Sequence, residues 1–206
     1  FLIDWLHIRD LLNQEKDTSV FKTLTPQLRK DVVSSASRFL DFTIWNQKGK
    51  IADIFDSDVA FVNEAVAKLY GNTSVKGAAF KQVKLDASQR SGLLTSPAFL
   101  MAHSGKDTTG FVHRGVFFLE ELVCRPVGDP PMGAVAAGLA RVAKADTSKM
   151  TQREIMESVH SADPSCNTCH IKIDPIGASF EIFDPMGQYR TTERGKTINA
   201  SGKLQG

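Results

Sequence analysis

The sequence predicts an all-α fold, an irregular helical bundle with one short β-hairpin near its C-terminus. In three segments, apolar residues recur three and four positions apart, which is the spacing of one helix face. No long stretch alternates apolar and polar residues as a half-buried strand does. The three apolar sets are Leu28, Val32, Val33, Ala36, Phe39 and Leu40; Val59, Val62, Val66 and Leu69; and Val112, Val116, Leu119 and Val123.

Start and stop signals flank these helices along the first two thirds of the chain. Residues 1–12 carry apolar side chains on one face and charged ones on the other, which predicts an amphipathic helix. Pro26 suits the first turn of the next helix, and Gly71 suits the end of the helix that follows. Pro126 and Pro130 end the third helix, because proline does not continue one.

The last third of the chain is predicted to contain a capped helix and a hairpin. Thr151 and Glu154 have the T-x-x-E spacing of a capping box, so we expect a helix over residues 151–160. Residues 189–198 predict a short β-hairpin whose turn is Arg194-Gly195-Lys196.

Length and composition limit the class of protein. The chain has 206 residues, of which 42% are hydrophobic and 23% charged, and its formal net charge is +2, as in ordinary soluble globular proteins. This balance does not favour nucleic-acid binding, and no apolar stretch is long enough to predict a membrane span. Because the chain does not begin with methionine, we expect a mature or excised piece.

The most informative motif is Cys166-Asn167-Thr168-Cys169-His170, which reads C-x-x-C-H. Two thiols three residues apart lie on one helical turn, where both can add to the two vinyl groups of a haem. The histidine that follows can bind the iron. The motif therefore predicts one covalent haem c on Cys166 and Cys169, with His170 as an iron ligand.

Two other uses of this cysteine pair are weighed against haem. A structural zinc site needs four ligands, and the third cysteine, Cys124, stands alone far upstream. A disulfide or thioredoxin-like redox pair is the second alternative, but no βαβ pattern surrounds the motif. Cys124 itself is expected to be a buried apolar thiol, with an interchain disulfide as the alternative.

The sixth coordination position of the iron is either filled by a second ligand, as in an electron carrier, or left open, as in an enzyme. His160, ten residues before His170, and Met186, sixteen after it, are the two candidate ligands. Alternatively, His160 interacts with the dipole at the C-terminal end of its helix or donates a hydrogen bond to a haem propionate. The alternative for Met186 is a core residue that packs against the porphyrin. His103 and His113 reach the iron only if their segment folds over the haem.

Residues after the motif are expected to build the haem crevice. Pro175 lies in a predicted turn over residues 174–177 that presents a backbone carbonyl to the Nδ1 atom of His170. Tyr189 and Arg190 are candidates for binding the propionates. Apolar side chains that exclude water and help set the reduction potential are Ile171, Ile173, Ile176, Phe180, Ile182 and Phe183.

The stretch over residues 160–190, HSADPSCNTCHIKIDPIGASFEIFDPMGQYR, resembles the planctomycete-type cytochrome c domain proteins, a family of large secreted proteins. Ser91-Gly92-Leu93-Leu94-Thr95 and the segment from His113-Arg114-Gly115 to Cys124 are similar to the same family's cytochrome-associated domain. The resemblance implies two domains, with residues 1–86 as the helical end of a preceding domain and residues 87–206 as a cytochrome c-like haem-binding domain.

The resemblance implies haem c on Cys166 and Cys169 with His170 as ligand, and a histidine is typical where His160 stands. Relatives often have another aliphatic residue at the place of Met186. It also implies that the chain is one portion of a longer polypeptide.

We therefore expect an electron-transfer module that exchanges electrons with a redox partner protein or with further domains of the same assembly. Haem is attached to such motifs outside the cytoplasm, so a periplasmic or cell-surface location follows. An enzyme with an open distal site, using His103, Asp107 or His113 as acid–base groups, is one alternative. A docking subunit of an electron-transfer assembly is the other.

Overall fold

The computed structural model describes residues 1–46 and 49–204, and about half of the chain is helical. The chain divides into two compact units. Unit 1 comprises Phe1–Thr109 and Phe183–Tyr189, and unit 2 comprises Gly110–Ile182 and Arg190–Gly206. The units meet at Thr109 and Gly110, whereas the sequence predicts a domain boundary between residues 86 and 87. A compact unit is not the same as a sequence domain, so that boundary stays a prediction.

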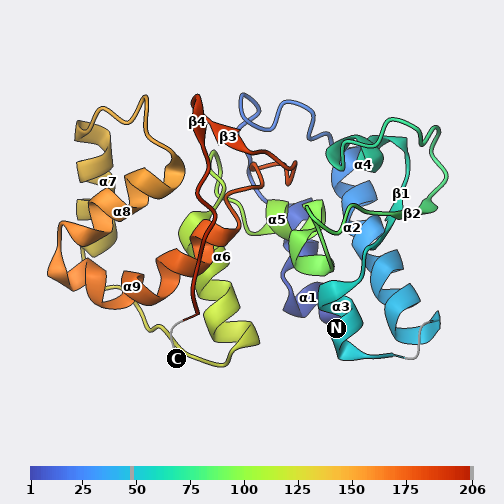
Figure 1. The fold of residues 1–206 in the computed structure, drawn as a ribbon, viewed down its shortest axis with the longest axis horizontal. Helices are drawn as coiled ribbons and strands as arrows, with labels where there is room; N and C mark the ends of the chain where they lie inside the picture. Colours follow the sequence, from blue (N-terminus) through green and yellow to red (C-terminus); the bar gives the residue numbers. More distant parts are fainter. Residues whose placement is uncertain (47–48, 205–206) are drawn as a thin grey trace. The chain divides into compact units, whose positions relative to one another are not determined.

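Unit 1 combines short helices with one pair of strands, coloured from blue to green in Figure 1. Its strands β1 and β2 are antiparallel, with Val59 opposite Lys84 and Val62 opposite Lys81. Its elements are α1 (Leu2–Trp5), a 3-10 helix (Ile8–Leu12), α2 (Pro26–Asp41), a π-helical turn (Phe42–Asn46), α3 (Ile51–Asp56), β1 (Val59–Val62), α4 (Glu64–Leu69), β2 (Lys81–Lys84), a 3-10 helix (Leu93–Thr95) and α5 (Pro97–Ala102).

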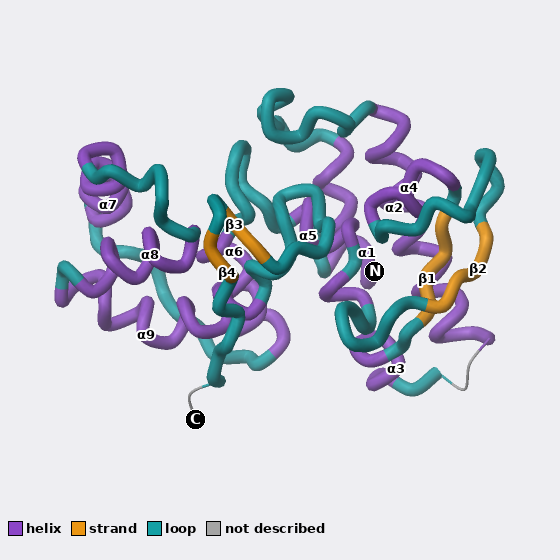
Figure 2. The backbone as a smooth tube through the Cα atoms, turned by 45° about the horizontal axis from the view of Figure 1, so that its top comes forward, coloured by secondary structure: helices purple, strands orange, loops and turns teal. Residues whose placement is uncertain are grey.

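Unit 2 is helical apart from one two-residue strand pair. Helices α8 and α6 both pack against α9. Its elements are α6 (Phe111–Phe117), a π-helical turn (Phe118–Leu122), α7 (Ala134–Lys144), α8 (Gln152–Ser161), α9 (Pro164–Ser179), β3 (Thr192–Glu193) and β4 (Lys196–Thr197). The expected all-α class is thus corrected to a helix-rich fold with two small antiparallel strand pairs, drawn in orange in Figure 2.

Helix α2 confirms the first predicted apolar face. All six of its predicted core residues are buried, and Pro26 occupies the first turn. The side-chain oxygen of Thr25 accepts a hydrogen bond from the backbone N–H of Leu28 and so caps the helix. Local signals therefore determined this helix from its cap to its buried face.

The N-terminal segment is not one continuous helix. It breaks at His7, whose φ of 54° is left-handed, and a 3-10 helix follows. Leu6 and Ile8 are both almost fully buried. Two residues two positions apart point about 200° from each other on an α-helix, so one continuous helix does not bury both. The break lets both side chains enter the core.

Val59 and Val62 belong to a strand, so the second predicted helix is wrong in its first half. The sequence Val-Ala-Phe-Val alternates partly exposed and buried residues, a period of two that β-branched and aromatic side chains favour. The helix begins only at Glu64, where the side-chain oxygen of Asn63 accepts a hydrogen bond from the N–H of Val66. Gly71 follows its end with a φ of +72°, as predicted.

Helix α6 forms where the third apolar set predicts a helix, but it buries another face. Phe111, Arg114, Gly115 and Phe117 are buried, whereas Val112 and Val116 are only half-buried. The reason is a close approach of α9: a Cβ atom on Gly115 would lie 2.6 Å from the carbonyl oxygen of Ile173. Backbone contact, not apolar periodicity, orients this helix.

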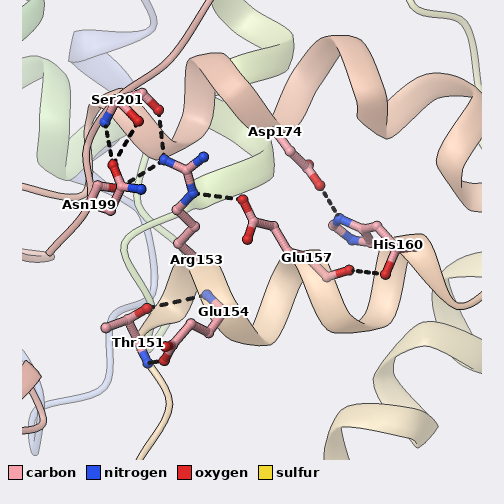
Figure 3. Close-up of polar contacts among 9 residues, drawn as sticks. Thr151, Arg153, Glu154, Glu157, His160, Asp174, Asn199 and Ser201 are labelled. Carbon is pink, nitrogen blue, oxygen red and sulfur yellow. Dashed lines mark hydrogen bonds and ion pairs between the residues drawn. The ribbon is translucent and has the colours of Figure 1, made fainter.

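Two C-terminal predictions are confirmed and the prediction for Cys124 is wrong. Thr151 and Glu154 form both hydrogen bonds of a capping box at the start of α8 (Figure 3). Strands β3 and β4 form the hairpin, with Arg194 and Gly195 both at positive φ. Cys124 is exposed and lies two residues after the π-helical turn, with a φ of 54°. Within the described residues, no helix has the length and apolar character that crossing a membrane requires.

Candidate metal centre

Helix α9 presents the C-x-x-C-H motif on its first turns. Asp163 caps this helix, since its side chain accepts a hydrogen bond from the backbone N–H of Ser165 over 3.0 Å. Cys166, Cys169 and His170 then follow at spacings of three and four residues, which place them on one face. Both thiols are free and half-buried.

Asp174 joins His170 to His160, which lies near the end of α8. The Nδ1 atom of His170 lies 2.8 Å from Oδ1 of Asp174, one turn further along α9. The Nδ1 atom of His160 lies 2.6 Å from the other oxygen, Oδ2, a contact drawn in Figure 3. Asp174 and His160 are both buried, each with 9% exposure. One buried carboxylate therefore contacts two imidazoles.

The two imidazole rings are stacked. Their centroids lie 3.4 Å apart and their planes differ by 23°. Because both Nδ1 atoms face Asp174, the Nε2 atoms lie on the opposite edges of the two rings. The donor atoms of His160, His170 and Asp174 lie within 4.8 Å of one another, close enough to hold a metal ion.

The charge of Asp174 fixes the roles in these hydrogen bonds. Burial raises the pKa of Asp174, but hydrogen bonds from His160 and His170 outweigh it, and the net pKa lies below its ordinary value. The ionised carboxylate only accepts hydrogen bonds. Each histidine therefore carries a proton on Nδ1, and a neutral imidazole with this tautomer can bind a metal through Nε2.

Helix α8 is held in place at both ends. Its first turn has the capping box, and Arg153 donates hydrogen bonds to Glu157 and to the carbonyl oxygens of Asn199 and Ser201 (Figure 3). At its other end, Arg141 of α7 donates to the carbonyl oxygen of Val159. These contacts tie the helix that carries His160 to α7 and to the C-terminal segment.

The turn predicted over residues 174–177 is wrong, because these residues continue α9. Pro175 lies inside that helix. The Nδ1 atom of His170 meets the carboxylate of Asp174 instead of a backbone carbonyl. Asp174 is the residue that sequence reasoning missed. Its position four residues after His170 would have indicated the contact if the helix had been extended through the proline.

The remaining predicted crevice residues have other contacts. Phe180 is buried in unit 2, and its carbonyl oxygen accepts from Arg114. Arg190, expected to bind a propionate, forms ion pairs with Glu181 and Glu193 over 3.2 and 3.3 Å. Ile171 is 48% exposed.

The other residues proposed for the iron or the distal side are spread over both units. In unit 1, Met186 is buried and Tyr189 makes an edge contact with Phe183. His103 is also buried there, with Nε2 3.0 Å from the carbonyl oxygen of Leu6. Asp107 of unit 1 and His113 of unit 2 are both exposed. Within unit 2, the structure brings His160 and Asp174 to His170.

Two family models match the chain. The first, PSCyt3, "protein of unknown function (DUF1588)", matches residues 90–193, just over half of the 206 residues. The second, PSD4, "protein of unknown function (DUF1592)", matches residues 1–71. Both describe domains associated with planctomycete cytochromes c. No curated protein and no solved structure matches the chain.

Proposed function

This chain belongs to the PSCyt3 family, and we propose that it carries one covalent haem c and acts as an electron-transfer protein. The observation that carries this proposal is the C-x-x-C-H motif on one face of α9, inside the matched region, with His170 oriented by Asp174. Haem c supplies one-electron exchange when it is bound.

The residues present fit covalent haem. Cys166 and Cys169 are free thiols, three residues apart on one helix and accessible to solvent, so both can form thioether bonds to one porphyrin. His170 keeps its proton on Nδ1 through Asp174, so its Nε2 atom is available to the iron. A zinc site fits less well, because among the described residues the cluster of His160, His170 and Asp174 includes neither cysteine.

Electron transfer needs no substrate pocket around the site, only access of a partner to the haem edge. We place the protein in the periplasm or at the cell surface, as part of a larger secreted polypeptide or complex, because haem is attached to such motifs outside the cytoplasm. The partner is a redox protein or another domain of the same assembly. The names of both matching families, which associate them with cytochromes c, support this role.

The test is expression of this chain in a bacterial periplasm that contains the haem-attachment machinery. We expect intact-mass spectrometry to show one added haem, and the C166A/C169A variant to show none. A reduced-minus-oxidised spectrum should give the bands of a c-type haem. Unmodified or disulfide-linked cysteines in the wild-type protein would contradict the proposal. A high-spin spectrum with cyanide binding to the untreated protein would instead support the alternative of a haem enzyme.

A further inference from the structure

We propose that His160 is a positioning residue on the same side of the haem as His170, which acts by sharing the Asp174 carboxylate. This inference rests on the proposed function, because it concerns the surroundings of the iron ligand. It replaces the expectation that His160 fills the sixth position. Two observations carry it: the stacking of the two imidazoles and the division of the Asp174 oxygens between them.

Because their rings are stacked, His160 and His170 lie on the same side of the haem. Two ligands on opposite faces of a haem each bind through a nitrogen about 2 Å from the metal, so their nearest atoms are about 4 Å apart across the iron. The rings of His160 and His170 have centroids only 3.4 Å apart and are nearly parallel. No porphyrin fits between them, and both point Nδ1 at the same carboxylate.

The shared carboxylate gives His160 a defined effect on His170. A carboxylate that accepts the Nδ1 proton of a metal-bound histidine makes that imidazole a stronger electron donor. In this site the second oxygen of Asp174 accepts from His160 over 2.6 Å, which draws part of the negative charge away from His170. Burial of Asp174 keeps water from replacing this second donor.

The direction of the change in reduction potential follows from how Asp174 is shared between His160 and His170. Without His160, Asp174 interacts more strongly with His170, the imidazole donates more charge, and the oxidised iron is stabilised. The reduction potential then shifts to a more negative value. Without the charge of Asp174 the potential shifts the other way.

The experiment compares haem-loaded variants by optical spectrum and by redox titration. His160→Phe keeps a flat ring for stacking but removes the donor. We expect an unchanged spin state and a more negative potential. His160→Gln offers an amide N–H to Asp174 and should return the potential toward the wild-type value. His113→Phe, at an exposed histidine of α6 in the same unit, is the control and should change neither property.

Two outcomes would overturn the inference. Loss of the low-spin bands in His160→Phe would make His160 the sixth ligand, and an unchanged potential would show that the shared carboxylate does not reach the iron. Asp174→Asn adds a check of the sign, since it should raise the potential.

A haem-free experiment separates this inference from the proposed function. In the C166A/C169A variant, ¹⁵N–¹H NMR of the imidazoles should show a proton on Nδ1 in both His160 and His170. A proton on Nε2 of His160 alone would contradict the shared carboxylate whether or not the wild-type chain binds haem. Two Nδ1–H histidines in a wild-type chain that takes up no haem would count against the proposed function alone.

Discussion

His160 and His170 come from two different helices, yet their rings stack with centroids 3.4 Å apart over the carboxylate of Asp174. The arrangement needs the end of α8 and the middle of α9 to be in register. It also needs a buried negative charge that both imidazoles neutralise in part. Substitutions at these contacts test both the arrangement and the fold around it.

Replacing Asp174 by alanine should destabilise the haem-free protein. The change leaves the Nδ1–H groups of His160 and His170 without their acceptor, and each buried donor without a partner costs about 1–3 kcal/mol. Urea unfolding followed by circular dichroism measures the loss. Asp129→Ala, at an exposed carboxylate, is the control and should change stability by less than about 0.5 kcal/mol.

The stability that Asp174 contributes should disappear in acid. Because the folded-state pKa of Asp174 lies below that of the unfolded chain, its contribution is present above about pH 4. It is lost as the pH falls through the folded-state pKa. The difference in urea midpoint between wild type and Asp174→Asn should therefore narrow below about pH 4. A difference that stays constant down to about pH 2 would contradict the assignment.

Gly115→Ala should destabilise the packing of α6 on α9. The new Cβ atom would meet the carbonyl oxygen of Ile173 at 2.6 Å, and a backbone atom within a helix does not move aside easily. We expect a loss of about 1–3 kcal/mol in the free energy of unfolding.

Gly138→Ala in α7 is the matched control, because its Cβ atom would meet only a methyl group of Val159 at 3.7 Å. Alanine has the higher helix propensity, so this variant should gain up to about 1 kcal/mol. Equal effects of the two substitutions would show that α6 and α9 do not approach as closely as described.

Thr151→Ala should remove the cap of α8 and cost about 1 kcal/mol. The Thr151 side chain accepts from the backbone N–H of Glu154 over 3.2 Å, and alanine has no acceptor for that group. Thermal unfolding provides the measurement. Ser161→Ala, which removes a hydroxyl bonded to the Glu157 carbonyl within the same helix, should be nearly neutral.

Cys124 should react with a thiol reagent in the native protein. Its exposed position at the end of the π-helical turn gives the reagent access without unfolding. In the C166A/C169A variant we expect one thiol to react at the same rate in buffer and in urea. A reaction that needs urea would restore the buried thiol predicted from the sequence.

Local sequence determined the elements whose signals lie within one or two turns. Helix α2 with its Thr25 cap, the capping box of α8 and the Arg194-Gly195 turn all follow from neighbours in the chain. The C-x-x-C-H spacing is equally local, so the sequence alone indicates the three residues of the predicted haem attachment. Short-range hydrogen bonds and steric limits are enough to specify such features.

Tertiary contacts decided the rest. Val59–Val62 became a strand because β2, about twenty residues later, pairs with it. The buried face of α6 was set by the absence of side chains at Gly115 and Gly177, where α9 comes within backbone contact. The meeting of His160, His170 and Asp174 required α8 and α9 to pack in one register, and a register between helices is fixed by the whole packed core, not by residues close in sequence.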